Sequence, residues 1–554
     1  MGRPLAIALL ARGRFDATGW ALGTTIRSCS SLCHVMDAPA TDIMTSSRPS
    51  KVRTSLPSAI RAPTPVAVTP SCTMSRARYG GNAIDCREGV MDGRRMAARV
   101  FHAVACLAVF LPSFAIAQDH SAGTLRVGAA KVDITPAPQD LPDHYRGVLD
   151  PVFSRAIVVD NGVTQVALVT VDALSLSGAV VERLGERIAA ETGIPVAQLL
   201  IAGTGTHSVP TAMTDADAPS PSALLWERRI VESVERARDR LRPATVTYGS
   251  GLSYINVQRD RIDPVTRRWW EGPDYAGVSD KRVGVMSFRD VEGEPIAAYY
   301  NYGVFNVVTG MLDLVSGDVT GAASAYIEDA VGEDFVAALA LAAHGDQNPV
   351  FFNQTFALRD LRIRDYAARG QDIALAMPPP GGQGLDRADP TVARLMDQQR
   401  RVNAALGLML GEEVLHVLRE SPPGASTAAI YTDQRVVSCP GRVRTNQGRG
   451  GVAGVYADAA PVEIRLGLVL IGDIAIGAVS GAPYAAIGAR LKAESPFART
   501  MLVTRANGYS AGYIPDDAAY GHETFAVLNA RLKPGCAEDA IVDGILGMMP
   551  PSRY

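Results

Sequence analysis

Short apolar runs that alternate with amphipathic helical patterns are the feature of this sequence that most limits its fold. Residues 153–160 (FSRAIVVD) and 166–172 (VALVTVD) are runs of the length and composition of strands. Residues 179–192 follow them and repeat apolar positions at helical spacing. Because strands that alternate with helices are typical of α/β domains, we expect a mixed central β-sheet flanked by helices.

The same alternation continues along the rest of the chain. Further strands are predicted at residues 199–202, 283–288, 296–302, 335–343 and 500–506, with a hairpin over 462–479 that turns near Gly472-Asp473. Further helices are predicted at residues 222–241 and 391–418.

Residues 91–117 have the three parts of a secretory signal peptide. Arginines open the segment, an apolar run follows over residues 100–114, and Ala115-Ile116-Ala117 gives the small-x-small pattern that signal peptidase accepts. The apolar run is shorter than a membrane span, so we expect cleavage after Ala117 rather than anchoring. The paired arginines leave twin-arginine export open as a route. The sequence therefore predicts an extracytoplasmic protein, periplasmic or secreted, with no transmembrane anchor after processing.

Residues 1–90 are rich in Arg, Ser, Thr, Ala and Pro and show no apolar period. We expect them to be an untranslated or disordered leader, with translation beginning at Met91 or Met96. Residues 118–554 then form a single domain with ample chain for a core.

The charge distribution limits the partners of this domain. The whole chain carries a net charge of −3, and its basic residues are in excess before residue 118, so the domain itself is more acidic. This balance argues against a nucleic-acid surface or a polybasic membrane anchor. The domain has two cysteines, Cys439 and Cys536, which either pair in an oxidising compartment or remain two buried thiols.

Several predicted strands end in small and polar residues. These ends are Asp172, residues 204–208 (TGTHS), residues 344–346 (HGD) and residues 507–509 (NGY). Ligands of α/β sheets bind beyond the carboxyl ends of strands, although the same residue types also form simple capping turns. We therefore take these four ends as candidates for the functional site.

A series of phrases, in order and at similar spacing, resembles the N-terminal domain of neutral, non-lysosomal ceramidases over about residues 125–540. They are VGAAKVDITPAP, VALVTVD, GTHSVP, NVQRD, SGDVTG, AHGDQNP, GAPYAAIGARLK and NGYSAGYIPDDAAY. The resemblance implies an amidase fold that cleaves the amide of an N-acylsphingosine with a zinc ion at the bottom of a pocket. The immunoglobulin-like C-terminal domain of larger members is not expected here.

The resemblance also implies two histidines, a glutamate and a tyrosine as zinc ligands. His207 in THSVP and Tyr513 in GYIP stand at two of these positions. The second histidine and the glutamate are replaced by Phe305 and Ala482, respectively. Asn348 stands where the family has a serine considered important for catalysis. The resemblance therefore implies His207, Asn348 and Tyr513 as catalytic residues, with His207 and Tyr513 as metal ligands.

Zinc binding depends on whether other side chains complete this set. Zinc sites ordinarily use three or four protein ligands, so His207 and Tyr513 alone predict weak zinc binding. His344 and Asp346 stand on a neighbouring strand end and are possible substitute ligands, or else cap the turn.

Three further residues resemble family positions that surround the substrate. Asn256 and Arg259 are implied near its polar head, and an arginine can hold an oxygen of a carboxylate or amide. Arg259 could instead form a surface ion pair with Asp260 or Asp263. Asp318 is implied beside the substrate site, or else caps a helix.

Two functions remain open from the sequence. The first is an exported hydrolase that cleaves a small lipid-like amide of the N-acylsphingosine type. The second is a non-catalytic ligand-binding homologue, because Phe305 and Ala482 remove two ligands. A serine hydrolase is disfavoured, because no Gly-x-Ser-x-Gly elbow is present and Ser480 has the wrong spacing.

Overall fold

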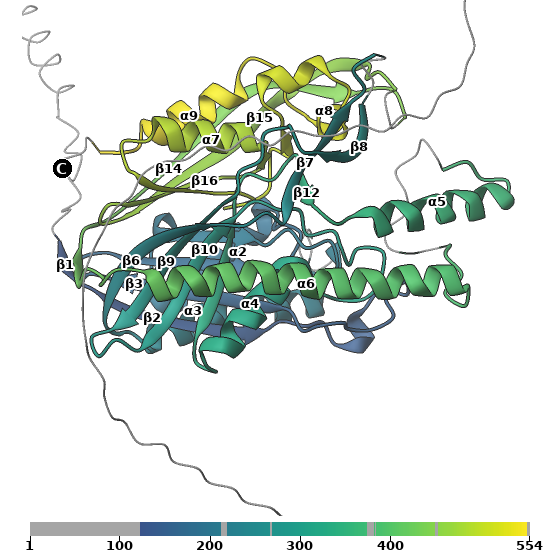
Figure 1. Cartoon of the computed structure of the whole chain (residues 1–554). Coiled ribbons are helices and arrows are strands. Elements are labelled where there is room, and N and C mark those ends of the chain that lie inside the picture. The colour runs from purple at the N-terminus through teal and green to yellow at the C-terminus, as the bar shows by residue number, and fades with distance from the viewer. Residues whose placement is uncertain are drawn as a thin grey trace, which may run out of the picture. The chain divides into compact units, whose positions relative to one another are not determined.

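The computed structural model (Figure 1) describes residues 122–211, 219–265, 269–373, 382, 384–448 and 452–550. The expected leader, residues 1–90, and the expected signal peptide, residues 91–117, lie outside these ranges. None of the described helices combines the length and apolarity that a membrane span needs.

An eight-stranded mixed sheet forms the centre of the described domain. Its order is β11-β10-β9-β6-β2-β3-β4-β5, with parallel pairs at both edges and antiparallel pairs between them. The strands are β2 (Arg126–Asp133), β3 (Phe153–Asp160), β4 (Gln165–Val171), β5 (Leu199–Gly203), β6 (Arg242–Leu252), β9 (Arg282–Asp290), β10 (Pro295–Tyr302) and β11 (Val336–Leu341).

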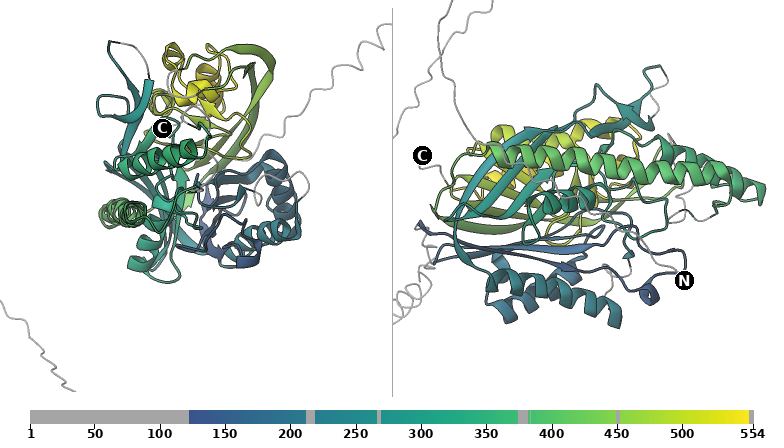
Figure 2. Two further views of the ribbon diagram at one scale, coloured as in Figure 1. Left: turned by 90° about the vertical axis from the view of Figure 1, so that its right-hand side faces the viewer. Right: turned by 60° about the horizontal axis from the view of Figure 1, so that its bottom comes forward.

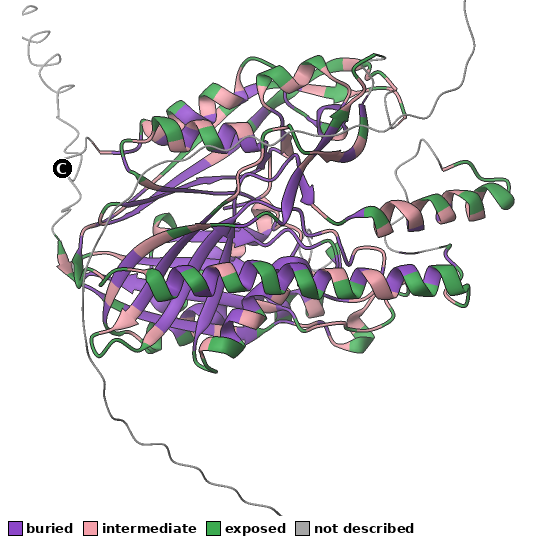
Figure 3. Cartoon of the chain, viewed as in Figure 1, coloured by how far each residue is buried: buried purple, intermediate pink, exposed green. Residues whose placement is uncertain are grey.

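A second, four-stranded sheet packs face to face on the first. Its strands are β14 (Ile430–Arg444), β15 (Tyr456–Ile471), β16 (Ile474–Val479) and β18 (Arg499–Val503). One continuous apolar core joins the two sheets and includes side chains such as Val159, Phe288, Ile471 and Ile476. Strands β3, β4, β5, β10, β11 and β16 are almost entirely buried, whereas much of β6, of β14 and of the first half of β15 is exposed or half-buried (Figure 3).

Three small ladders complete the strands. They are β12 (Gln347–Pro349) with β7 (Asn256–Ile262) and β8 (Trp269–Asp274), β17 (Ala482–Pro483) with β19 (Tyr513–Ile514), and β1 (Gly123–Thr124) with β13 (Thr427–Ala428).

Helices cover the outer faces of both sheets, which gives a helix–sheet–sheet–helix arrangement (Figure 1). The larger sheet is covered by α2 (Gly178–Thr192), α3 (Pro221–Asp239), α4 (Asp318–Val331) and α6 (Pro390–Glu420). The smaller sheet is covered by α7 (Ala485–Glu494) and α9 (Ala537–Leu546). The remaining helices are α5 (Asn353–Ala368) and α8 (Phe525–Asn529).

Capping residues explain where several helices begin and end. Ser177 and Ser220 cap α2 and α3 by accepting backbone N–H groups of the first turn, and Asp389 does the same for α6. Gly193 ends α2 at φ 75°, in the left-handed region that suits glycine.

Two glycines allow the long helix α6 to lie close against α4. A Cβ atom at Gly407 would stand 2.6 Å from the Ala322 Cβ, and one at Gly411 would stand 2.7 Å from the Tyr326 ring. Both contacts are too short for any larger residue without a shift of the helices. Figure 2 shows α6 running along the sheet, and this packing fixes α4, whose first residue is Asp318.

Cys439 and Cys536 form a disulfide that joins β14 to the start of α9 across 97 residues of sequence. Of the two alternatives that the sequence leaves open, the structure has the paired form.

The expected fold class, an α/β domain with a mixed central sheet flanked by helices, is confirmed. The predicted strand over residues 153–160 has the same bounds as β3.

Candidate functional site

The candidate site lies where four loops meet after the strands β5, β10, β11 and β18. Backbone hydrogen bonds join these loops: His207 N donates to Asn306 O (3.0 Å), Ala342 N to Tyr302 O (3.0 Å) and Gly203 N to Arg505 O (3.4 Å). Backbone hydrogen bonds therefore hold together segments that are far apart in the sequence.

His207 is the accessible histidine of this site. Its side chain is exposed, whereas Thr206 and Ser208 on either side are buried. Desolvation by the buried residues around it lowers the pKa of His207, and the positive charges of Arg505 and Arg259 lower it further, to about 3. His207 is therefore a neutral imidazole at physiological pH, set at an opening among buried residues.

Phe305 lies at the centre of the aromatic side chains of the site. Its ring centroid is 4.8 Å from that of His344, 6.1 Å from that of His207 and 6.1 Å from that of Tyr513. Phe305 itself is buried, and Tyr513 is partly exposed. An apolar ring therefore adjoins both residues that match the family's metal ligands.

Ala482 also lies in this region, because β17 pairs with β19 in parallel and places Ala482 directly beside Tyr513. The side chain of Ala482 is fully buried. The four positions that the family resemblance links, His207, Phe305, Ala482 and Tyr513, are thus brought together from four different segments of the chain.

His344 is buried, and both of its ring nitrogens have partners. Arg505 Nε donates to His344 Nε2 at 3.0 Å, so Nε2 is unprotonated and the ring proton is on Nδ1. Nδ1 lies 2.9 Å from Ala342 O, to which it donates. Burial and the charge of Arg505 lower the pKa of His344 well below its ordinary value. The ring is a neutral acceptor that holds Arg505 in place.

The residues present do not fit a zinc ion. Within the part of the chain that the structure describes, no three His, Cys, Asp or Glu side chains gather as a metal site requires. The lone pair of His344 Nε2 accepts a hydrogen bond from Arg505, and the apolar ring of Phe305 adjoins both His207 and Tyr513. We therefore derive no chemical step through zinc.

Arg259 on β7 is buried in an aromatic environment. Its guanidinium carbon lies 4.5 Å from the centroid of the Phe305 ring, 5.5 Å from that of Tyr513 and 5.4 Å from that of Phe525. Its Nη2 donates to Gly345 O at 2.8 Å, whereas its Nε has no hydrogen-bond partner. Arg259 forms no ion pair with a described residue, so the alternative of a surface pair with Asp260 or Asp263 does not describe it.

Arg505 approaches Phe305 from another side, with its guanidinium carbon 5.8 Å from the ring centroid. Besides the bond to His344, its Nη1 donates to Leu174 O at 3.1 Å. Its backbone has φ 51°, which is uncommon for a residue other than glycine. Like Arg259, it makes no ion pair with a carboxylate among the residues described. The site thus holds two buried guanidinium groups beside one ring.

Asp346 lies between β11 and β12, and Asn348 lies on β12. Asn348 is buried, its Nδ2 donates to Glu271 Oε1 at 3.2 Å, and its Oδ1 accepts no hydrogen bond. Asp346 Oδ1 accepts from Ala485 N at 2.9 Å, at the first turn of α7. Burial raises the pKa of Asp346 to about 7. Asp346 therefore caps a helix, as one reading of the sequence allows.

Asn256 and Asp318 are both buried and bound within the protein. Asn256 Nδ2 donates to Asp280 O at 2.9 Å and to Gly303 O at 2.6 Å. Asp318 Oδ2 accepts from the backbone N and the hydroxyl of Thr309, at 2.8 Å and 2.6 Å. Asn256 and Asp318 therefore stabilise the loops of the site through these hydrogen bonds, and their side chains do not line its accessible surface.

Sequence reasoning missed Arg505. It identified the end of the strand at residues 500–506 as a site candidate but considered only the following residues 507–509. One feature of the sequence could have identified Arg505. It is a charged residue that stands between a predicted apolar strand and the turn-forming pair Asn507-Gly508.

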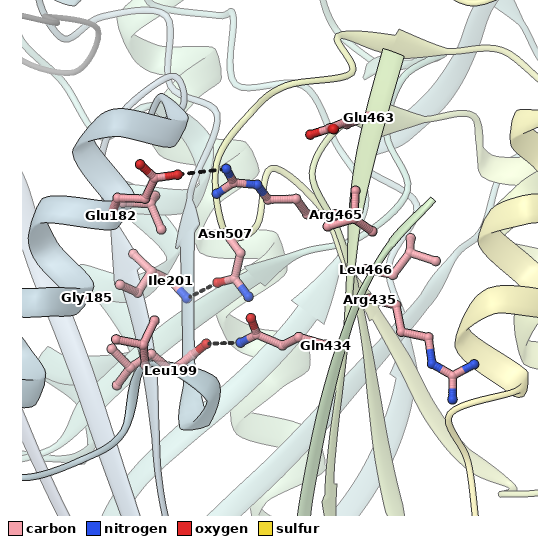
Figure 4. A pocket seen from close by; sticks show the side chains of 13 residues that line it. Glu182, Gly185, Leu199, Ile201, Gln434, Arg435, Glu463, Arg465, Leu466 and Asn507 are labelled. Atoms are coloured by element: carbon pink, nitrogen blue, oxygen red, sulfur yellow. Dashed lines mark hydrogen bonds and ion pairs between the residues drawn. The ribbon is translucent and has the colours of Figure 1, made fainter. Parts of the chain in front are cut away.

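A separate pocket of about 340 Å³ lies between α2 with β5 and the hairpin of β14 with β15 (Figure 4). Its lining includes the ion pair of Glu182 with Arg465 (2.9 Å), and Asn507, whose Oδ1 accepts from Ile201 N. Of the four strand ends that the sequence offers as site candidates, only residues 507–509 contribute to it, through Asn507, and neither His207 nor Tyr513 lines it. The pocket is therefore distinct from the candidate site around His207.

Comparison with known proteins adds one family and two structures. The family described as neutral/alkaline non-lysosomal ceramidase, N-terminal, matches residues 126–358. A ceramidase complexed with C2 and the neutral ceramidase from Pseudomonas aeruginosa align with TM-scores of 0.56 and 0.57. Each has 18% identity, over 77% of this chain and 74% of the other. At that identity the likeness shows the fold alone. No curated protein is recognisably similar in sequence.

Proposed function

We propose that this protein is an exported hydrolase that cleaves the amide of an N-acylsphingosine-like lipid, because the family described as neutral/alkaline non-lysosomal ceramidase, N-terminal, matches residues 126–358. The observation that carries the proposal is the placement of an accessible, neutral His207 beside two buried guanidinium groups. A base and a positively charged pocket are the two elements that attack of water on an amide requires.

The chemistry follows from these residues. His207, whose pKa is about 3, is unprotonated and able to accept a proton from water as the water attacks the amide carbon. The guanidinium groups of Arg259 and Arg505 would stabilise the negative charge that develops on the carbonyl oxygen. His207 then returns this proton to the amide nitrogen, and the C–N bond of the tetrahedral intermediate breaks, which releases the amine and leaves a fatty acid. A base of such low pKa is weak, so we expect slow turnover.

Export rests on two independent supports. Residues 91–117 have the pattern of a signal peptide, and the Cys439–Cys536 disulfide suits an oxidising compartment.

The test is release of fatty acid from an N-acylsphingosine by the purified protein, with and without a chelator. We expect release that the chelator does not abolish and that His207→Ala lowers by at least about a hundredfold. His416→Ala is the matched control, because His416 is an exposed histidine on α6, and it should leave the rate unchanged. Release that depends on stoichiometric zinc would contradict the metal-free chemistry.

A second function, a non-catalytic binding protein, is favoured by Phe305 and Ala482, the apolar residues at the two replaced ligand positions. Binding of the lipid without any release of fatty acid would establish this alternative in place of the hydrolase.

A further inference from the structure

The charge of Arg259 and Arg505 is not balanced within the site. The two side chains are only 5% and 3% exposed, and neither forms an ion pair with a described residue. Burial of an unpaired charge costs several kcal/mol, so such groups normally have a partner. The nearest partners here are a backbone carbonyl for each arginine and the neutral ring of His344.

The neighbouring carboxylates are directed elsewhere. Asp260 accepts from Tyr484 Oη at 2.5 Å and from Trp269 Nε1 at 2.9 Å, and Glu271 accepts from Asn348. Asp346 caps α7, and burial raises its pKa to about 7. These groups weaken the positive potential around Arg259 without contacting its guanidinium group.

Donor capacity remains on both arginines. The Nε of Arg259 has no partner although its side chain is 95% buried, and Arg505 Nη2 makes no hydrogen bond to a described residue. Both groups adjoin the ring of Phe305, which also adjoins the accessible His207. The strained backbone of Arg505, with φ 51°, is held by its N–H bond to Gly481 O at 3.0 Å. Strain of this kind persists where a function fixes the side chain.

We propose that Arg259 and Arg505 together bind the carboxylate of a lipid, at the place where the family would hold its metal. A guanidinium group matches a carboxylate with parallel hydrogen bonds, and the rings of Phe305, Tyr513 and Phe525 offer an apolar surface for the adjoining chain. The inference rests on the proposed function in one respect: both place the ligand in the site around His207. The carboxylate has two possible sources, a fatty acid product or a substrate whose head group is acidic, such as an N-acyl amino acid.

The experiment is calorimetric titration of the full protein with three short-chain ligands that stay dissolved as monomers. Octanoate represents the fatty acid, N-octanoylglycine represents the acidic head group, and octanamide is the neutral counterpart. We expect at least one carboxylate to bind at least about tenfold more tightly than octanamide, and the stronger of the two identifies the source. Equal binding of octanamide, or binding of inorganic phosphate as tight as that of the lipid carboxylates, would overturn the proposal.

Variants test the residues separately. Arg505→Gln should weaken carboxylate binding by at least about tenfold and leave octanamide binding unchanged. Arg499→Gln is the matched control, because Arg499 lies on β18, the strand that precedes Arg505, but pairs with Asp473 at the surface. Unchanged carboxylate binding in Arg505→Gln would overturn the proposal, and the ligand comparison on the unmodified protein decides it if that variant does not fold. Loss of fatty acid release with carboxylate binding intact would refute the hydrolase and not this site.

Discussion

Arg155 and the pair of Arg259 and Arg505 are equally buried but have opposite surroundings. Arg155 is 2% exposed, and its guanidinium group contacts Glu328 at 2.8 Å and Asp172 at 3.0 Å. Arg259 and Arg505 have no such carboxylate among the residues described, and they contact aromatic rings, backbone carbonyls and a neutral histidine instead.

The difference separates a structural charge from a functional one. The cluster of Arg155 joins β3 to α4 and is complete without a ligand, since Lys131 and the backbone N–H of Ala337 also bind Glu328. The arginine pair near His207 is incomplete, because the buried Nε of Arg259 has no hydrogen-bond partner and neither guanidinium group pairs with a carboxylate among the described residues. Burial alone does not distinguish the two clusters. They differ in whether carboxylate groups pair with the buried guanidinium groups.

The largest effect is expected when Arg155 is removed. Arg155→Met keeps the side-chain volume but leaves the buried carboxylates of Glu328 and Asp172 without their partner, which should lower the free energy of unfolding by about 3–5 kcal/mol. Urea denaturation followed by circular dichroism measures this change. A loss below about 1 kcal/mol would mean that the cluster is not a structural charge network.

The sequence predicted the scaffold of these clusters better than their chemistry. Strand and helix periodicity placed β3, β5, β10, β11 and the long helix α6 within a few residues, because local burial patterns determine them. The segment after β18 was recognised as a site candidate, but Arg505 was not.

The reason is that partners are a property of tertiary structure. In the sequence Arg155, Arg259 and Arg505 all stand in or directly after a strand. Which of them has a carboxylate nearby depends on the position of Glu328, 173 residues after Arg155 in the chain. The family resemblance indicated where the site lies. The structure was needed to show that His344 accepts a hydrogen bond from Arg505.

A smaller effect is expected on acid stability. Burial raises the pKa of Glu328, but Arg155 and Lys131 outweigh this, so the pKa ends below its ordinary value of 4.5. A carboxyl group with a lowered pKa stabilises the folded state above its unfolded pKa, and this contribution is lost as the pH falls below about 4.5. The free energy of unfolding should therefore fall more steeply between pH 5 and pH 3 in the unmodified protein than in Glu328→Gln. Parallel pH profiles for the two proteins would contradict the assigned ion pairs.

The smallest effect on stability is expected at Arg259, although its effect on binding should be large. Arg259→Met removes an unpaired buried charge, which stabilises the fold, and also removes the contact with Phe305 and the bond to Gly345 O, which destabilises it. These terms oppose each other, so the free energy of unfolding should stay within about 1 kcal/mol of the unmodified value. Urea denaturation under the conditions used for Arg155→Met gives the direct comparison. A loss as large as that of Arg155→Met would show that Arg259 is held by the protein as a structural charge, and the distinction between the two clusters would fail.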